Sequence, residues 1–556
     1  MNVSIGIMVP MSDGIALATD VWTPAGPGPF PTLLVRTPYH RRQMPPMYVE
    51  HGYAMVVQDC RGKFDSEGLF TPLADEAQDG QDTVAWIADQ KWCSGRIAMF
   101  GGSYLGFVQI PAAAGGHEAL RCIVPQVAAI SYFRDWARYD GCPSLCNALN
   151  WNLDTASSAT LSGLSHVNYA ELHAARTLDE VFALAGLECD TLRQWMSHDR
   201  YDEYWENIDQ APMLEKVRIP AYHMGSWFDH HLPGQFEAYA GIRDRGATDA
   251  ARSGQRLMFG PWGHSAYATS YANMGDQEQQ YGEWTFPAEA CMSVRTFEKR
   301  FLDLHMKDQD DGFRDEPPVR VFLMGANRWV DFTDWPPPDA AVQTWHLHSK
   351  GHADTSAGPG LLSRETPGDQ PPDSYTYDPA DPMPTRGGPV YQGINERGPM
   401  DQRPLFDRSD FVYYRSEALA ASLNVVGNIE LDLWIASSAL DADFIARLCV
   451  VEPSGSVTCF TYGSLRCKYR DSWSDPKPLE PGTPTRIHLQ LGHTAYTFAA
   501  GARIALLITS SSFPRIIPNP GTMDKPLSGG EQVVARQAVL HDADHPSCLR
   551  LPVVDL

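Results

Sequence analysis

A serine, an aspartate and a histidine each follow an apolar stretch of the chain. Ser103 comes after two glycines at the end of such a stretch, and Asp229 and His264 each close a later one. A histidine can remove the proton of a serine hydroxyl, while an aspartate orients the imidazole and stabilises its charged form. These three residue types therefore predict nucleophilic catalysis with Ser103 as the attacking group.

The order of the three residues, serine then aspartate then histidine, is that of α/β-hydrolases and differs from the order in chymotrypsin and subtilisin. α/β-Hydrolases carry the serine on a strained turn between a strand and a helix. Residues 79–89 predict a helix, 97–102 a strand and the residues after Ser103 a further helix. One departure is Gly106, which follows the serine by three residues, with Leu105 at the usual glycine position. Taken alone, the motif leaves open a glycine-rich turn with an idle serine.

The alternation of elements divides the chain into four segments. Residues 1–133 alternate strands and helices, as in a mostly parallel sheet with helical crossovers. Residues 134–216 have helical periodicity and no predicted strand, so we expect a helical cap inserted over the site. The sheet resumes over 217–335, which carries the aspartate and the histidine. Residues 336–556 contain only strands and predict a C-terminal β-sandwich.

Composition limits the classes of partner. The chain has 556 residues, enough for two or three domains, and a net charge of −24. Nucleic acid and anionic lipid both require a basic surface, so neither is expected as a partner. A small-molecule ester or amide is the expected partner, and a homo-oligomer stays open.

Cysteine usage and hydropathy favour a cytoplasmic protein without a cofactor. The eleven cysteines include no CxxC pair, and Cys142 and Cys146 lack histidines at a zinc spacing. We expect reduced core thiols, no metal and no cofactor. No apolar stretch is long enough to span a membrane, and the N-terminus lacks the pattern of a signal peptide.

The sequence resembles the cocaine esterase-like hydrolases, which are grouped with X-prolyl dipeptidyl-peptidases and α-amino-acid ester hydrolases. The resemblance extends over nearly the whole chain. It rests on the serine turn and on dispersed motifs at residues 11–22, 36–39, 58–62, 260–264, 317–325, 398–402 and 510–515. It implies an α/β-hydrolase fold with an inserted helical cap and a C-terminal jelly roll packed against the catalytic domain.

The resemblance also implies roles for individual residues. It makes Ser103 the nucleophile with Asp229 and His264 as partners. By this resemblance, the oxyanion hole consists of the Tyr39 hydroxyl and the Tyr104 backbone N–H. The glycine at position 106 agrees with the turn of this family. A tyrosine hydroxyl suits the role because a neutral donor stabilises the developing oxyanion.

Residues near the catalytic aspartate bear on specificity. Relatives that bind a free α-amino group carry acidic residues just after that aspartate or on the cap, because a buried ammonium needs a carboxylate partner. Here His230 and His231 follow Asp229. This disfavours aminopeptidase and amino-acid ester chemistry, although an aspartate of the insertion could substitute: Asp135, Asp140 or Asp154.

Three further residues are candidates for substrate contact. Trp136 and Trp151, at the start of the insertion, are expected to line an apolar pocket, with packing in the core as the equal alternative. Arg386 lies where the sandwich of the family approaches the site. It would meet an anionic substrate group or be an ordinary surface arginine.

The leading hypothesis is a serine hydrolase that cleaves carboxylic esters of a small acyl or aromatic substrate through an acyl-enzyme, with activated amides as an extension. The first alternative is an X-prolyl dipeptidyl-peptidase or α-amino-acid ester hydrolase. The non-enzymatic alternative is a degenerate scaffold whose β-sandwich binds a ligand or partner. A complete set of catalytic residue types disfavours the last.

Overall fold

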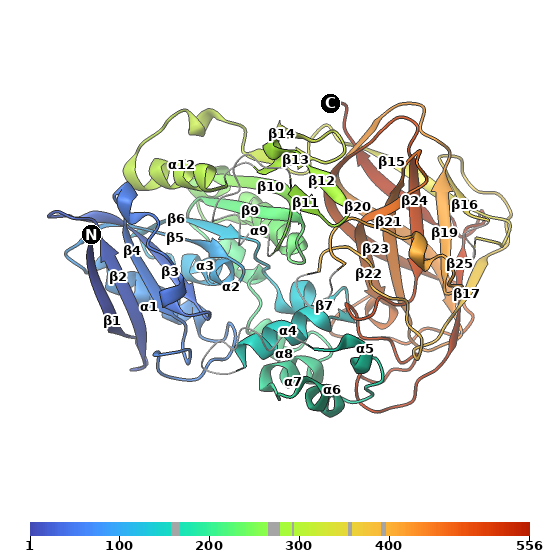
Figure 1. Cartoon of the computed structure of the whole chain (residues 1–556), viewed down its shortest axis with the longest axis horizontal. Coiled ribbons are helices and arrows are strands. Elements are labelled where there is room, and N and C mark those ends of the chain that lie inside the picture. Colours follow the sequence, from blue (N-terminus) through green and yellow to red (C-terminus); the bar gives the residue numbers. More distant parts are fainter. Residues whose placement is uncertain (157–166, 265–278, 292–293, 354–357, 391–395) are drawn as a thin grey trace.

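The computed structural model describes the chain except residues 157–166, 265–278, 292–293, 354–357 and 391–395. In Figure 1, the part with the sheet and its covering helices lies on the left and the β-rich part lies on the right. A group of helices lies below both parts. The fold is an α/β-hydrolase with a helical insertion and a C-terminal β-sandwich, as the sequence predicts.

A ten-stranded sheet is the centre of the catalytic part. Its order is β1-β2-β4-β3-β5-β6-β9-β10-β13-β14, and all pairs from β4 to β13 are parallel. The bounds are β1 (Asn2–Pro10), β2 (Ala16–Thr23), β3 (Phe30–Thr37), β4 (Ala54–Asp59), β5 (Cys93–Gly102), β6 (Leu120–Gln126), β9 (Ala221–Phe228), β10 (Gln255–Gly263), β13 (Val319–Leu323) and β14 (Arg328–Phe332). Central strands such as β4 are buried along their whole length, because helices cover both faces of a parallel sheet.

Helices cover the two faces of this sheet. In Figure 1, α12 lies above the strands, and α1 and α3 overlap the strands in the left-hand part of the view. The bounds are α1 (Glu76–Ala88), α2 (Tyr104–Phe107), α3 (Gln109–Ala114), α9 (Leu232–Arg245), α10 (Asp249–Ser253) and α12 (Val294–Lys307), with short turns η1 (Arg41–Gln43), η2 (Val49–His51), η5 (Ala288–Cys291) and η6 (Phe313–Asp315) and the hairpin β11 (Gln279–Tyr281) and β12 (Trp284–Phe286).

Outside residues 157–166, the insertion is helical apart from one small hairpin. Its elements are η3 (Phe133–Ala137), β7 (Arg138–Tyr139), β8 (Cys142–Pro143), α4 (Cys146–Thr155), α5 (Tyr169–Leu172), α6 (Leu178–Ala185), α7 (Asp190–Ser197), α8 (Glu203–Glu206) and η4 (Ala211–Lys216). The expectation of no strand is wrong at β7 and β8, which pair antiparallel. The turn between them is Asp140-Gly141 with φ of 46° and 81°, the positive values that a two-residue hairpin turn requires.

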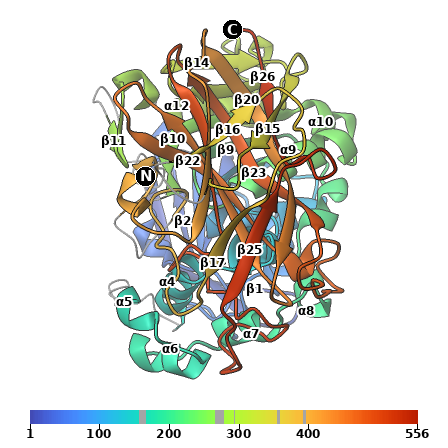
Figure 2. The ribbon, with the colours of Figure 1, turned by 90° about the vertical axis from the view of Figure 1, so that its right-hand side faces the viewer.

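The C-terminal part is a β-sandwich. Its strands are β15 (Ala341–His348), β16 (Gly360–Ser363), β17 (Asp373–Tyr377), β18 (Met400–Asp401), β19 (Phe411–Ser416), β20 (Leu423–Ser437), β21 (Asp443–Val451), β22 (Val457–Arg466), β23 (Thr485–Phe498), β24 (Arg503–Thr509), β25 (Ala535–Leu540) and β26 (Cys548–Val553), with turns η7 (Arg403–Leu405) and η8 (Cys467–Tyr469). Figure 2 looks onto these strands. Along β20, Leu431, Leu433 and Ile435 are fully buried, which follows from the two-residue period of a strand.

Backbone hydrogen bonds join the insertion to the sandwich. The N–H groups of Leu145 and Cys146 donate to the carbonyls of Arg515 and Pro514 over 2.9 and 3.0 Å. Further along, the N–H of Leu178 donates to the carbonyl of Leu527 over 3.1 Å. Two separate stretches of the insertion are therefore fixed to one loop of the sandwich.

The cysteines and the hydropathy of the helices complete the description. Ten cysteines fall in the part of the chain whose side chains are described, and all ten are free and buried. Within that part, no helix is both long enough and apolar enough to cross a membrane.

Candidate active site

The turn after β5 holds Ser103 in a strained conformation. Its φ and ψ are 59° and −129°, a region that residues other than glycine rarely adopt. The Ser103 N–H donates to the carbonyl of Gln126 over 2.9 Å, and the Ser103 carbonyl accepts from the N–H of Gly106 over 2.8 Å. These bonds fix the turn and lift the serine hydroxyl off the end of the sheet.

Close packing explains why glycines surround this serine. Gly101 has φ of 135°, and a β-carbon there would lie 2.7 Å from Cβ of Leu105. A β-carbon on Gly106 would lie 2.7 Å from Cβ of Ala128, in the loop after β6. The short helix α2 therefore runs too close to that loop for a side chain at position 106. The shifted glycine is a packing requirement of this turn.

Asp229 and His264 meet at the ends of neighbouring strands. They follow β9 and β10, which are parallel, so the carboxyl ends of both strands lie at one edge of the sheet. Nδ1 of His264 lies 2.7 Å from Oδ2 of Asp229, and the N–H of His231 donates to Oδ1 of Asp229 over 2.6 Å. Because Nδ1 is held by the carboxylate, Nε2 is the nitrogen of His264 that can exchange a proton.

Tyr39, at the end of β3, lies between the serine and the insertion. The indole N–H of Trp151 donates to the Tyr39 hydroxyl over 2.9 Å, and Ser103 contacts the same phenol. Burial raises the pKa of Tyr39 to about 12, although the hydrogen bonds from Trp151 and Ser103 work in the opposite direction. The phenol therefore stays protonated, and its own hydrogen remains available for donation.

Tyr104 offers its backbone to the same place and uses its side chain elsewhere. It is the first residue of α2, so its N–H has no acceptor within the helix. Its hydroxyl donates to Oε1 of Glu76 over 2.8 Å and accepts from the N–H of Leu73 over 3.1 Å. The side chain thus anchors the turn and leaves the N–H as the candidate oxyanion donor.

Trp136 and Trp151 belong to a buried aromatic cluster, which we call the aromatic wall. Their ring centroids are 4.7 Å apart, and Trp136 also stacks on Tyr132 at 4.9 Å. Phe107 lies 5.5 Å from Trp136, and Trp195 stacks on Trp151 at 6.1 Å. Sequence reasoning missed Tyr132, Phe107 and Trp195, because apolar aromatics on helices look the same in a core and in a pocket.

His230 and His231 pack between the aromatic wall and His264. The ring of His231 lies 4.6 Å from that of Trp136, and the rings of His230 and His264 are 4.7 Å apart. Burial lowers the pKa of His231 to about 3 and holds that of His230 well below its usual value. Both imidazoles are therefore neutral at physiological pH.

A hollow of about 370 Å³ adjoins Asp229. It lies between α9 and the sandwich strands β20, β22 and β23, and both Asp229 and His230 reach it. Its walls also carry charged side chains, namely those of Arg134, Asp135, Asp140, Glu237 and Arg515.

The three aspartates of the insertion occupy two places. Asp135 and Asp140 line the hollow, and burial raises the pKa of Asp135 to about 7 and that of Asp140 to about 6. Asp154 lies one turn of α4 beyond Trp151, where its charge raises the pKa of Tyr39. Burial raises the pKa of Asp154 itself to about 6.

Arg386 is engaged in ion pairs. Its guanidinium contacts Glu396, lies 3.2 Å from Oε1 of Glu283, and donates to the carbonyl of Asp401. Among the described residues, these contacts hold the hairpin of Glu283 against the sandwich. The structure does not bring Arg386 into contact with Ser103.

Comparison with known proteins agrees with this arrangement. Residues 13–266 match the X-Pro dipeptidyl-peptidase (S15 family) model, and residues 311–550 match the X-Pro dipeptidyl-peptidase C-terminal non-catalytic domain. The chain is 33% identical to cocaine esterase of Rhodococcus sp. (strain MB1 Bresler), over 100% of this chain and 99% of that one. It is 27% identical to a putative serine esterase of Mycobacterium bovis, over 92% and 91%.

Two solved structures resemble the whole chain. An aminopeptidase from a marine sediment archaeon, Thaumarchaeota archaeon, superposes with a TM-score of 0.87 at 25% identity, covering 100% of this chain and 96% of that one. An α-amino-acid ester hydrolase superposes with a TM-score of 0.85 at 25% identity and the same coverage. With a full-length relative at 33% identity and both family models matched in order, this chain belongs to the X-Pro dipeptidyl-peptidase (S15) family of serine hydrolases, together with cocaine esterase.

Proposed function

We propose that this protein hydrolyses carboxylic esters through an acyl-enzyme formed on Ser103. The observation that carries the proposal is the 2.7 Å contact between Nδ1 of His264 and Oδ2 of Asp229, at the same edge of the sheet as the strained turn of Ser103. A histidine oriented in this way is the base that a serine nucleophile needs. The serine esterases among the relatives support the same chemistry.

The mechanism assigns one task to each residue. Nε2 of His264 removes the proton of the Ser103 hydroxyl as its oxygen attacks the ester carbonyl, and Asp229 stabilises the imidazolium. The Tyr39 hydroxyl and the Tyr104 N–H donate to the oxyanion of the tetrahedral intermediate. His264 returns the proton to the leaving alcohol. A water molecule, deprotonated by the same histidine, then releases the acid from the serine.

The surroundings favour an uncharged acyl group. The aromatic wall is apolar, and the low pKa values of His230 and His231 leave both rings neutral. An ammonium buried there without a carboxylate would lose several kcal/mol of solvation. Esters of simple aliphatic or aromatic acids are therefore the preferred substrates.

One observation favours a second candidate, an α-amino-acid ester hydrolase. Asp154 lies near Tyr39, and its Oδ1 is buried without a hydrogen-bond partner among the described residues. A carboxylate in that position could pair with the α-ammonium of a substrate. The α-amino-acid ester hydrolase among the structural relatives makes this candidate worth testing.

The proposed function is tested with a fluorophosphonate and a panel of esters. The probe should label Ser103, and p-nitrophenyl esters of short and aromatic acids should be hydrolysed with a higher kcat/KM than X-Pro p-nitroanilides. Labelling that persists in Ser103→Ala would remove Ser103 from the mechanism. A higher kcat/KM on the anilides would instead make the protein a dipeptidyl-peptidase.

We also propose a cytoplasmic location. The ten free and buried cysteines support it, because thiols persist in a reducing compartment and commonly pair in an oxidising one. Fractionation of cells that produce the full-length chain should find the esterase activity in the cytosolic fraction. Activity in an extracellular or envelope fraction would refute this location.

A further inference from the structure

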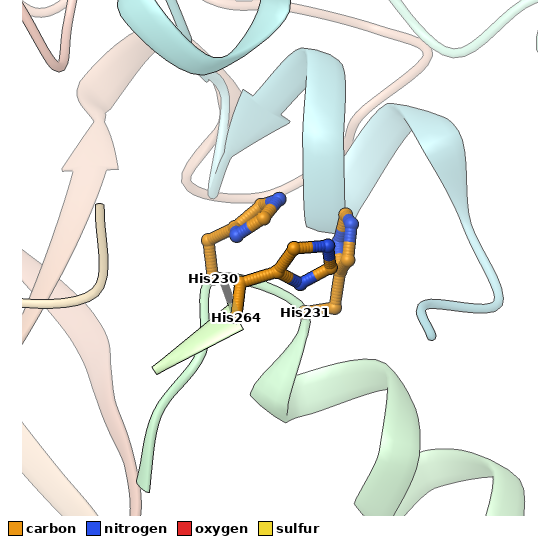
Figure 3. Close-up of side chains that lie close together, drawn as sticks. All are labelled: His230, His231 and His264. Carbon is orange, nitrogen blue, oxygen red and sulfur yellow. The ribbon is translucent and has the colours of Figure 1, made fainter. Parts of the chain in front are cut away.

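Three imidazoles converge at the candidate active site. One ring nitrogen from each of His230, His231 and His264 can be chosen so that all three lie within 4.8 Å of one another. Figure 3 shows the three rings side by side, with His264 between the other two in this view. All three side chains are buried, and histidine is a common ligand of divalent transition metals.

The backbone explains why consecutive histidines face the same place. His230 and His231 lie in the turn between β9 and α9, and His231 is the residue directly before that helix. The bond from its N–H to Asp229 holds the turn tightly, so the two rings lie only 3.8 Å apart. His264 follows the neighbouring strand β10 and is the third histidine of the cluster.

The His231 side chain has unmet hydrogen-bonding capacity. It is fully buried, and the one hydrogen-bonding group that the described residues offer its ring is the backbone of Asp135, which leaves the second ring nitrogen without a partner. A buried polar atom without a partner destabilises the folded protein. A ligand that accepts the nitrogen lone pair would remove this cost.

His264 is already oriented as a metal-binding histidine would be. Its Nδ1 is held by the carboxylate of Asp229, and histidine ligands in metal sites commonly donate the N–H of their second ring nitrogen to such a carboxylate. The opposite nitrogen, Nε2, is then the one that faces a metal. In the proposed mechanism the same nitrogen takes the serine proton.

We propose that His230, His231 and His264 bind a divalent transition metal, Zn²⁺ in the first place, and that binding reversibly inhibits the serine hydrolase. Tetrahedral zinc with bonds of about 2.0–2.1 Å holds its nitrogen ligands about 3.4 Å apart, so the three ligand nitrogens must approach one another by up to about 1.4 Å. Three histidines leave a fourth position for water. The inhibition, though not the binding, rests on the proposed role of His264.

Inhibition follows from competition for one lone pair. A metal on Nε2 of His264 prevents that nitrogen from accepting the proton of Ser103. No bond is made or broken in the protein, so a chelator should restore activity fully. The metal therefore acts as a switch on a serine enzyme and takes no part in ester cleavage.

The experiment measures metal binding and turnover separately on the full chain. The protein is stripped with a chelator and titrated with ZnCl₂ in a calorimeter. A second metal-free sample is titrated with CoCl₂, and the visible absorption of tetrahedral Co²⁺ is recorded. Ester hydrolysis is measured with and without zinc. We expect one zinc ion per chain and a loss of turnover by at least about tenfold that is reversed by the chelator.

The matched variants are His231→Phe and His51→Asn. The first keeps a ring against the aromatic wall and removes two nitrogens, and the second removes an exposed histidine outside the cluster. We expect zinc affinity to fall by at least about tenfold in His231→Phe and to stay unchanged in His51→Asn. For each variant, the rate of ester hydrolysis with zinc is divided by its own rate without zinc. A change in the basal rate then does not affect the measured inhibition.

Each outcome decides one part of the proposal. Equal zinc binding by the parent and His231→Phe would place the metal elsewhere and overturn the site. Zinc binding that depends on His231 but leaves turnover unchanged would overturn the inhibition. A protein that binds zinc at this cluster and hydrolyses no ester would refute the proposed function while the metal site stands.

Discussion

The indole N–H of Trp151 donates a hydrogen bond to the hydroxyl of Tyr39 over 2.9 Å. This bond connects the insertion to the proposed oxyanion donor at the end of β3. It occupies one lone pair of the phenol and orients the hydroxyl, whose hydrogen is then free to point at the substrate. In the proposed mechanism the insertion therefore contributes to the chemistry as well as to the shape of the pocket.

The first prediction concerns this pair. Tyr39→Phe should lower kcat by about 100-fold and leave KM nearly unchanged, because the donor acts mainly in the transition state. Trp151→Phe keeps a ring in the aromatic wall and removes only the N–H, so kcat should fall by a few-fold, about 1 kcal/mol. Steady-state kinetics with one p-nitrophenyl ester measures both. An unchanged kcat in Tyr39→Phe would make Tyr39 a packing residue.

The second prediction concerns the triad. Ser103→Ala, Asp229→Asn and His264→Ala should each remove most turnover while the protein stays folded, and combining them should add little, because the three residues act as a unit. Ester hydrolysis is measured together with circular dichroism. If Ser103→Ala kept more than about a tenth of the parent rate, another nucleophile would be responsible.

The third prediction concerns the choice between neutral and amino substrates. Asp154→Asn should leave kcat/KM for a simple ester unchanged within about threefold, since no cation is bound in the proposed reaction. If an α-amino-acid ester exceeds its des-amino analogue by roughly tenfold in the parent, about 1.4 kcal/mol, the simple-ester preference is wrong. If Asp154→Asn then abolished that advantage, Asp154 would be the ammonium partner.

The fourth prediction concerns packing at the serine turn. An alanine normally stabilises a helix over glycine by about 1 kcal/mol, but the β-carbon at position 106 would lie 2.7 Å from Ala128. Gly106→Ala should therefore lower the free energy of unfolding by about 1–3 kcal/mol and also reduce turnover. Gly368→Ala, where nothing lies within 4 Å, is the control and should be neutral. A stable and active Gly106→Ala would show that the turn can relax.

The fifth prediction concerns stability in acid. His223 is fully buried in β9, and burial lowers its pKa to about 4, although a hydrogen bond to Gln255 favours its charged form. Between pH 6.5 and 4 the unfolded chain binds a proton that the folded protein does not, so stability falls as the pH falls. At pH 5 this histidine should cost about 2 kcal/mol relative to pH 7.5.

His223→Gln isolates that contribution. Glutamine can still donate to Gln255 and does not titrate, so the difference in unfolding free energy between pH 7.5 and pH 5 should shrink by about 2 kcal/mol. Urea denaturation at both pH values measures it. An unchanged difference would mean that His223 is protonated in the folded protein as readily as in the unfolded chain.

Local rules in the sequence predict much of the fold. The glycines before Ser103 and the apolar runs before Asp229 and His264 indicate strand ends, and parallel strand ends must meet at one edge of a sheet. The hairpin β7–β8 also has a local signal, the pair Asp140-Gly141, which a helical interpretation of the insertion overlooks. Whether the expected segment boundaries coincide with independent folding units stays a prediction.

Contacts between distant segments could not be predicted in the same way. The bond between Trp151 and Tyr39 spans 112 positions and depends on how α4 lies over the sheet. The predicted triad brings His264 to Asp229, but the sequence does not show that the rings of His230 and His231 face His264, because that contact depends on the register of β9 and β10. Apolar periodicity identifies a buried face without showing what it faces.

The attachment of the insertion to the sandwich has a consequence for how substrate enters. Backbone hydrogen bonds hold Leu145, Cys146 and Leu178 to one loop of the sandwich, so the insertion cannot swing aside as a hinged lid without breaking them. It is a fixed roof. This attachment holds Trp151 against Tyr39 before any substrate arrives, so the oxyanion donor of the proposed mechanism is already oriented in the free protein.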